Sequence, residues 1–269
     1  MRGGDAPGRP PAGAFGRVAV AGDERHCRFA GDAVELLDRP TYEVGARIIG
    51  DAGLAAVRLL APVLPGKIVA VGLNYRAHAD ELKMAVQPEP ILFMKPRTAV
   101  IGPGETIVRP ARSIQVDYEA ELVVVVGRRC KDVSPAEAAA FVAGYTCGND
   151  VTARDLQKVD GQWTRGKGFD TFCPLGPWIE TDLDPADVLI TCRVDGELRQ
   201  MASTREMVFS VPQLLVYISS VMTLEPGDVI LTGTPAGVGQ ILDGSEVEVS
   251  IEGIGELRNP VRADRSHPI

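Results

Sequence analysis

The stretch QVDYEAELVVVVG, from Gln115 to Gly127, joins three acidic residues to an uninterrupted apolar run. Side chains alternate between the two faces of a strand, so a strand here places Asp117, Glu119 and Glu121 on one face. The run LVVVV is apolar on both faces, which is typical of a buried strand. Three carboxylates beside a protein core repel one another, so they need a compensating cation or contact with water.

A hard divalent cation such as Mg²⁺ or Mn²⁺ suits such a face. These ions prefer oxygen ligands and keep positions open for water or substrate. The later stretch GNDVTARD offers further carboxylates in Asp150 and Asp155. Two simpler interpretations stay open at this point. The acidic strand end could lie in solvent, and Asp150 could be an ordinary turn residue after Gly148 and Asn149.

The composition limits the classes of partner. The chain has 269 residues, of which 45% are hydrophobic, and its 36 acidic and 28 basic residues give a net charge of −8. This acidic balance, without a basic run, argues against binding to nucleic acid or to an anionic membrane surface. No stretch reaches the roughly 18 to 20 apolar residues that span a bilayer, and the N-terminus lacks the apolar core of a secretory signal.

The cysteines indicate a reducing compartment. The five cysteines are odd in number, scattered and never spaced C-x-x-C, so we expect reduced thiols in a cytoplasmic protein. With only three histidines in the chain, a histidine-rich transition-metal site is not expected.

Strand patterns dominate the chain. Residues 1–15 are predicted to form a flexible tail rich in Gly and Pro, residues 16–64 a small N-terminal β domain, and residues 65–263 the main domain. The few predicted helices do not alternate regularly with the strands. We therefore expect an α+β, β-rich protein with a mixed, largely antiparallel sheet.

Three segments are predicted to be helical. In SPAEAAAFVAG, Ser134 fits the N-cap, Pro135 the first helical position and Glu137 the third, and the helix should end at the following glycine. The segment VPQLLVYISSVM (211–222) has apolar residues on one helical face. A short helix followed by a connection is expected within residues 41–57.

Several motifs together resemble the fumarylacetoacetate hydrolase family. Six segments match in order and cover most of the main domain; they are VGLNYRAHADEL (71–82), PILFMKP (90–96), VDYEAELVVVVG (116–127), GYTCGNDVTARDLQ (144–157), RGKGFDTFCPLGPWI (165–179) and PGDVILTGTPAGVG (226–239). The resemblance implies a roll or barrel of mixed β-sheet as the catalytic domain. It also implies the small N-terminal β domain of the family's isomerase-type bacterial members.

The resemblance implies a set of functional residues. The family's E-x-E pair corresponds to Glu119 and Glu121 and its third carboxylate to Asp150, so these three are the implied ligands of Mg²⁺ or Mn²⁺. Asp117 is not implied as a ligand. The remaining implied residues are His78, Glu81 and Lys167 for catalysis, and Tyr75, Gln157, Gly233 and Thr234 for substrate binding.

Substrates of the family are 2-oxo acids or their enols, which implies a metal-dependent enzyme and a small-molecule substrate. The ion would act as a Lewis acid and hold the enolate that forms when the neighbouring C–C bond breaks. His78 and Glu81 lie three residues apart, so on one helical turn Glu81 can hold the imidazole while His78 takes a proton from water. Lys167 suits developing negative charge.

Several functions stay open. The His78 and Glu81 pair favours hydrolysis of an acylpyruvate or a fumarylacetoacetate-like acid over decarboxylation of an oxaloacetate-like acid. Isomerisation or decarboxylation of 2-hydroxyhepta-2,4-diene-1,7-dioate in aromatic catabolism is the runner-up. A non-catalytic relic that binds metal or ligand is an alternative of another class. The resemblance further implies a homodimer.

Overall fold

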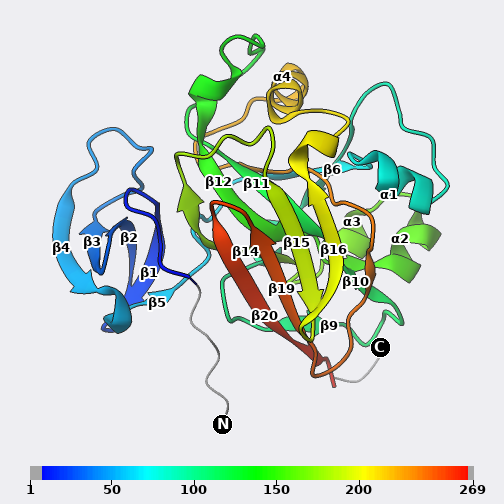
Figure 1. Ribbon diagram of the computed structural model, residues 1–269, viewed down its shortest axis with the longest axis horizontal. Helices are drawn as coiled ribbons and strands as arrows, with labels where there is room; N and C mark the ends of the chain where they lie inside the picture. The colour runs from blue at the N-terminus through cyan, green and yellow to red at the C-terminus, as the bar shows by residue number, and fades with distance from the viewer. Residues whose placement is uncertain (1–7, 266–269) are drawn as a thin grey trace.

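β-Strands account for most of the regular structure, as the sequence patterns predict. The computed structural model describes residues 8–265, so residues 1–7 of the predicted tail lie outside the described residues. The described residues form a 12-stranded, a 5-stranded and a 3-stranded sheet (Figure 1). Most strand pairs are antiparallel and a few are parallel. The expected β-rich, mixed fold is confirmed, but the order of the described strands leaves each sheet open rather than closed into a barrel.

The N-terminal strands form one end of the 12-stranded sheet and lie to the left of the main body in Figure 1. They are β1 (Phe15–Val20), β2 (Asp23–Ala30), β3 (Ala33–Leu37), β4 (Ile48–Gly53) and β5 (Arg58–Leu59). Pairing of Phe15 with Ile179 joins them to the rest of the sheet. Ala14, within the predicted tail, is buried and exchanges backbone hydrogen bonds with its surroundings. The boundary near residue 64 stays a prediction.

The rest of the 12-stranded sheet contains the buried apolar run. It continues with β14 (Cys173–Glu180), β12 (Val142–Asn149), β11 (Ala120–Val126), β17 (Val229–Leu231), β6 (Ile68–Gly72) and β7 (Ile91–Lys95), and β8 (Val100–Ile101) pairs with β14. All residues of β11 are buried, because β12 and β17 flank the strand and other elements cover its faces. The LVVVV run therefore forms the central strand that its composition predicts.

Two smaller sheets complete the main body. The 5-stranded sheet has the order β16 (Glu197–Ser203), β15 (Leu189–Val194), β19 (Glu246–Ile251), β20 (Gly255–Ala263) and β9 (Ile107–Arg109). The 3-stranded sheet has the order β13 (Thr152–Ala153), β10 (Val116–Tyr118) and β18 (Gly239–Gln240). In β19 the alternating sequence EVEVSI buries only its apolar side chains, as expected for a strand with one wet face.

Short helices connect the strands. The α-helices are α1 (Arg76–Glu81), α2 (Arg154–Asp160), α3 (Thr164–Lys167) and α4 (Val211–Val221), and the 3₁₀ turns are η1 (Leu54–Ala56), η2 (Arg97–Ala99), η3 (Ala138–Phe141) and η4 (Thr204–Glu206). The predicted helix at 211–222 is confirmed as α4. Ser210 and Gln213 form its capping box, and Leu214, Leu215 and Ile218 form its buried face.

The predicted helix after Ser134 is wrong. Its capping residues do contact each other, because the Ser134 hydroxyl donates to Glu137, but they close only a turn that leads into η3. From Val142 onward the chain pairs with β11 as strand β12. Sheet pairing therefore overrides the local helical signal at this point. Asp150 therefore directly follows a strand.

The helix expected within residues 41–57 is also wrong. Ile48–Gly53 forms β4, which pairs antiparallel with β3. Only the short 3₁₀ turn Leu54–Ala56 follows it. The edge of a neighbouring strand supplies backbone partners there that the sequence pattern of one segment does not reveal.

A break in the acidic stretch positions the site. β10 ends at Tyr118 and β11 begins at Ala120, so Glu119 lies between two strands that belong to different sheets. The backbone N–H of Glu119 donates to the side-chain oxygen of Asn149 at 2.9 Å instead of continuing a ladder. The acidic residues thus sit where the chain passes from one sheet to the other.

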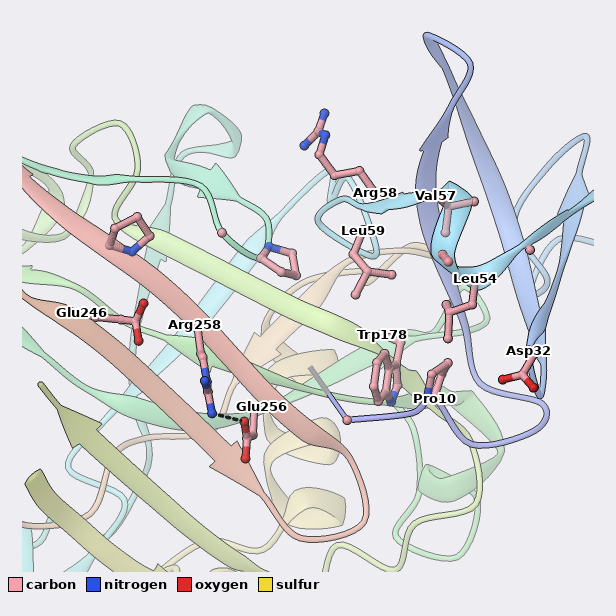
Figure 2. A pocket seen from close by; sticks show the side chains of 16 residues that line it. Pro10, Asp32, Leu54, Val57, Arg58, Leu59, Trp178, Glu246, Glu256 and Arg258 are labelled. Carbon is pink, nitrogen blue, oxygen red and sulfur yellow. Dashed lines mark hydrogen bonds and ion pairs between the residues drawn. The ribbon is translucent and has the colours of Figure 1, made fainter. Parts of the chain in front are cut away.

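A second feature of the fold is a cavity that lies away from these residues. It has a volume of about 840 Å³ and lies between the N-terminal strands and β20. Figure 2 shows Leu54, Leu59 and Trp178 at one end, and Arg258 paired with Glu256 at the other. None of the functional residues implied by the sequence lines this cavity.

Candidate active site

Three carboxylates that the sequence predicts as metal ligands converge in the main body. Glu119 lies in the break before β11, Glu121 belongs to β11, and Asp150 directly follows β12. The pairing of the two strands places Glu121 opposite Gly148, close to Asp150. One oxygen of each carboxylate lies within 4.8 Å of the others, and all three residues are buried. We call Glu119, Glu121 and Asp150 the acidic triad.

Two buried lysines hold part of the acidic triad. The Nζ atom of Lys167 lies 2.7 Å from Glu119 Oε2 and 2.5 Å from Asp150 Oδ2. On the other side, Lys95 Nζ lies 2.5 Å from Asp150 Oδ1 and donates to the carbonyl of Val151 at 3.2 Å. Asp150 is therefore fixed from both sides by ammonium groups, as a buried carboxylate must be.

Arg154 fixes the other side of the triad. Its Nε atom donates to Asp117 Oδ2 at 2.9 Å, Nη2 donates to Glu119, and Nη1 donates to Gln157 Oε1 at 2.8 Å. Asp117 thus pairs with a guanidinium group and is not part of the acidic triad. The planar guanidinium group joins α2 to the acidic stretch through several directed hydrogen bonds.

The buried charges do not cancel. With all carboxylates ionised, Asp117 and the acidic triad carry four negative charges against three positive charges on Lys95, Lys167 and Arg154, which leaves a formal charge of −1. A divalent cation in the triad changes this value to +1. A positive site attracts an anionic substrate, whereas the bare cluster repels it.

Glu121 is the triad member without a cationic partner. Its Oε2 atom accepts a hydrogen bond from the backbone N–H of Gly233 at 2.7 Å, and it forms no ion pair with a described Lys, Arg or His. Burial, together with the charges of Asp150 and Glu119, raises the pKa of Glu121 well above its ordinary value. A buried cluster of carboxylate oxygens with one uncompensated member fits a hard divalent ion such as Mg²⁺ or Mn²⁺.

Glu119 and Lys167 hold each other in the charged state. Burial alone would raise the pKa of Glu119, but Lys167 and Arg154 lower it below its ordinary value. Burial would likewise lower the pKa of Lys167, but Asp150 and Glu119 raise it. The charged forms are therefore favoured by opposite charges at contact distance.

α1 carries the predicted histidine pair. His78 Nδ1 lies 2.9 Å from Glu81 Oε2, as the three-residue spacing on one helical turn predicts. The other oxygen of Glu81 accepts from the backbone N–H of Gly237 at 3.1 Å, which ties α1 to the glycine-rich turn. Because a carboxylate accepts, His78 donates from Nδ1 and keeps Nε2 as its basic nitrogen.

A cavity of about 340 Å³ brings most of the predicted residues together. Its wall includes the acidic triad together with His78, Gln157, Lys167 and Thr234. Glu81 is linked to the cavity through His78. Tyr75 and Gly233 do not line it.

The predicted substrate contacts on the glycine-rich turn have other partners. Gly233, with φ of 97°, gives its N–H to Glu121 and so orients a member of the triad. Thr234 Oγ1 donates to the carbonyl of Ala120 at 2.9 Å and accepts from Gln200 Nε2 at 2.8 Å, while its side chain still lines the cavity. The turn therefore braces the start of β11.

Tyr75 lies in the core. It is 1% exposed, and its hydroxyl group has no hydrogen-bond partner among the described residues. Burial, with smaller contributions from Glu121 and Glu206, raises the pKa of Tyr75 above its ordinary value. The structure gives it no direct access to the cavity, so its predicted contact with substrate remains a prediction.

The residues of this site lie within a segment that matches a known protein family. The family model described as fumarylacetoacetate hydrolase C-terminal matches residues 67–262, which include the triad, the histidine pair and Lys167. The chain belongs to the fumarylacetoacetate hydrolase family. The resemblance inferred from the six motifs is thereby confirmed.

Relatives within the family have several activities. A 2-hydroxyhepta-2,4-diene-1,7-dioate isomerase of Mycobacterium marinum has a TM-score of 0.87 and 46% identity, over 94% of this chain and 99% of that one. A mitochondrial oxaloacetate tautomerase of Bos taurus is 46% identical over 76% of this chain and 69% of that one. A fumarylpyruvate hydrolase of Pseudomonas aeruginosa, in complex with Mn²⁺ and pyruvate, has a TM-score of 0.71 and 34% identity, over 74% and 91%.

These relatives define what this chain shares with its family. Fumarylacetoacetate hydrolase family members include isomerases, tautomerases and hydrolases of oxo acids, and this chain has an acidic cluster with the composition of a metal site. Among its described residues, none of the helices has the length and apolar character needed to cross a membrane.

Sequence reasoning missed several residues that support the site. Lys95 is the last residue of an apolar strand in the motif PILFMKP. Nothing else in the sequence indicated that this lysine supports the site. Asn74 holds the start of α1 by donating to the carbonyls of Phe209 and Thr232 at 3.0 and 2.7 Å. Gln200 lies on β16, far from the motifs in sequence, and no pattern marked it.

Proposed function

We propose that this chain is a divalent-metal-dependent hydrolase that cleaves the C–C bond beside a 2-oxo acid, with an acylpyruvate or fumarylacetoacetate-like substrate. The observation that carries the proposal is the shared cavity, in which His78, Lys167 and the acidic triad meet. Hydrolysis needs a base that activates water next to the bound oxo acid. The pair of His78 and Glu81 supports this role.

The acidic triad would hold Mg²⁺ or Mn²⁺. When bound, such an ion supplies Lewis-acid polarisation of a 2-oxo acid and offsets the negative charge of the reaction. The Mn²⁺ and pyruvate of the Pseudomonas hydrolase support the same class of ion and product here. The uncompensated Glu121 carboxylate is the feature of this chain that supports metal binding.

The proposed steps use residues of this chain. His78 Nε2 takes a proton from water while Glu81 holds the imidazole in one tautomer. The water oxygen bonds to the distal carbonyl carbon, and the C–C bond breaks with its electron pair passing to the pyruvate fragment as an enolate. Lys167, buried and 5.0 Å from the centre of the Phe93 ring, supplies the proton that converts the enolate to pyruvate. His78 then releases its proton to water and Lys167 takes one up, so both groups return to their starting states.

Isomerisation of a 2-hydroxydienedioate is the second candidate. The Mycobacterium marinum isomerase aligns with 94% of this chain, including the N-terminal strands, whereas the fumarylpyruvate hydrolase aligns with 74%. Decarboxylation of an oxaloacetate-like acid uses the same cavity without an attacking water. A non-catalytic relic is less well supported, because the histidine pair and Lys167 are all in place around the triad.

Turnover of a small panel tests the proposal. Acetylpyruvate, oxaloacetate and 2-hydroxyhepta-2,4-diene-1,7-dioate are assayed separately with Mg²⁺ and Mn²⁺. We expect release of pyruvate and acetate from acetylpyruvate. His78→Ala should lower this turnover by about 10² to 10⁴-fold, with Mn²⁺ affinity nearly unchanged in calorimetry.

Different outcomes separate the alternatives. Turnover of the dienedioate alone favours the isomerase, and turnover of oxaloacetate alone favours the decarboxylase. Metal binding without turnover of any of the three acids would defeat the enzymatic assignment and leave the relic.

The assembly and location remain proposals as well. We propose a homodimer, as the family resemblance implies, and a cytoplasmic location. The five cysteines are all buried free thiols, which supports a reducing compartment. Sedimentation of the purified chain measures the assembly directly.

A further inference from the structure

One positively charged side chain that lines the cavity of about 340 Å³ has no role in the function proposed above. Three lysine and arginine side chains line this cavity, namely Arg154, Lys158 and Lys167. Arg154 and Lys167 are buried and form ion pairs with the acidic stretch. Lys158 is exposed, and its ammonium group has no carboxylate partner within residues 8–265.

α2 places Lys158 farther from the acidic triad than Arg154. The two residues are four apart on this helix, so they share one face and are separated by about 6 Å along the axis. Arg154 contacts Glu119 at the buried end. The helix then runs outward, and its last residues are exposed. Lys158 therefore lies on the solvent side of the same cavity.

The acidic residues nearest to Lys158 in sequence are already engaged. Asp160 forms an ion pair with Arg165, with Nε 2.8 Å from Oδ2. Asp155 accepts a hydrogen bond from the Ser113 hydroxyl at 2.5 Å. The positive charge of Lys158 is therefore not neutralised locally and stays available to a bound anion.

Apolar side chains share the cavity with these charges. Leu82 and Met84, which follow α1, line it together with Phe93 and Trp163. The Phe93 and Trp163 rings pack edge to face with centroids 5.1 Å apart. Because the triad is buried while Met84 and Lys158 are exposed, the cavity runs from an acidic inner end past an apolar wall to a cationic mouth.

We propose that Lys158 binds the second carboxylate of a dicarboxylic 2-oxo acid and so selects diacids over monoacids of the same length. The inference rests on the proposed function, because it assumes that the 2-oxo carboxylate binds at the triad. The carbon chain between the two carboxylates then lies against Phe93 and Met84. An exposed ammonium group contributes to selectivity mainly through charge, so the preference should weaken at high salt.

A binding measurement tests this inference and does not depend on turnover. Calorimetry in the presence of Mn²⁺ compares 2-oxoglutarate with 2-oxopentanoate, which have the same number of carbons but differ in the second carboxylate. We expect the native chain to bind 2-oxoglutarate at least about threefold more tightly. Lys158→Gln should remove this preference by weakening only 2-oxoglutarate, Lys158→Glu should reverse it, and Lys158→Arg should keep it.

Lys131→Gln is the matched control, because Lys131 is an exposed lysine that does not line the cavity. Equal binding of both acids by the native chain, or an unchanged preference in Lys158→Gln and Lys158→Glu, would overturn the inference alone. If the native chain binds neither acid and turns over none of the panel, the proposed function fails instead.

Discussion

Some side chains of the site could be predicted from the sequence, whereas others depend on contacts that only the fold reveals. Glu119, Glu121 and Asp150 stand out because carboxylates rarely adjoin a run such as LVVVV. Lys95 does not stand out, since a lysine at a strand end usually lies in solvent. Only the fold shows that its ammonium group is buried against Asp150. A residue whose role depends on one distant partner is not readable from its own surroundings in sequence.

Lys95 yields a prediction about stability. Lys95→Met removes the cation from Asp150 Oδ1 and from the carbonyl of Val151, although Lys167 still pairs with Asp150. Leaving a buried carboxylate oxygen without its partner should lower the free energy of unfolding by about 3 kcal/mol. Urea unfolding of the chain measures this loss.

The control is Lys131→Met, which breaks an exposed ion pair with Asp132 and should change the free energy of unfolding by less than about 0.5 kcal/mol. If both variants unfold at the same urea concentration as the native chain, Lys95 does not support the site as described.

Among the elements, strands with a clear pattern were predicted and segments with competing partners were not. β11 and α4 follow from their own apolar patterns. Residues 142–144 carry a helical signal, yet they pair with the end of β11. Pairing with a strand that is distant in the sequence determines the structure of these residues. A single amino-acid sequence does not show which strands become neighbours in a sheet.

The turn after β17 also depends on a distant element. Gly233 has φ of 97°, and a Cβ atom there would lie 2.7 Å from the Cβ atom of Asn74. Gly233→Ala should therefore strain the turn and displace the N–H that orients Glu121. We expect a loss of about 1 to 3 kcal/mol in unfolding free energy and weaker binding of Mn²⁺.

Gly244 supplies a matched control for this turn. It has φ of 87°, and no atom lies within 4 Å of a Cβ built there. Gly244→Ala should show the backbone cost without a change in Mn²⁺ affinity. Equal Mn²⁺ affinities for the two variants in calorimetry would remove the role assigned to the Gly233 N–H.

At the scale of the whole molecule, the acidic triad joins segments that are far apart along the chain. Its members come from the break before β11, from β11 itself and from the residue after β12, and their cationic partners come from β7, α2 and α3. An ion that binds only the folded arrangement stabilises the whole fold by mass action. The family-level architecture could be predicted from the six motifs, whereas this network depends on contacts between segments that are far apart in the sequence.

Metal binding should therefore raise the melting temperature. Mn²⁺ at about 100 times its dissociation constant should add about 2.7 kcal/mol to the unfolding free energy. Glu121→Gln keeps the shape of the side chain but removes the uncompensated charge, so the gain on adding Mn²⁺ should largely disappear. Differential scanning calorimetry with and without Mn²⁺ measures both effects.

The exposed Glu137 supplies the control. Glu137→Gln should retain the full rise in melting temperature. A rise of the same size in Glu121→Gln would show that the ion binds elsewhere or does not use Glu121.

The break at Glu119, where the chain passes from one sheet to another, affects the register that β11 adopts against its neighbouring strands. A run of valines fits its neighbours almost equally well after sliding, because each step replaces one apolar side chain with another. The acidic residues beside it do not tolerate sliding, since each would lose its ammonium, guanidinium or amide partner. The polar residues at the start of β11 therefore fix the register of its valine run against the neighbouring strands. The carboxylates that we propose as metal ligands thus also disfavour mispairing of the central sheet.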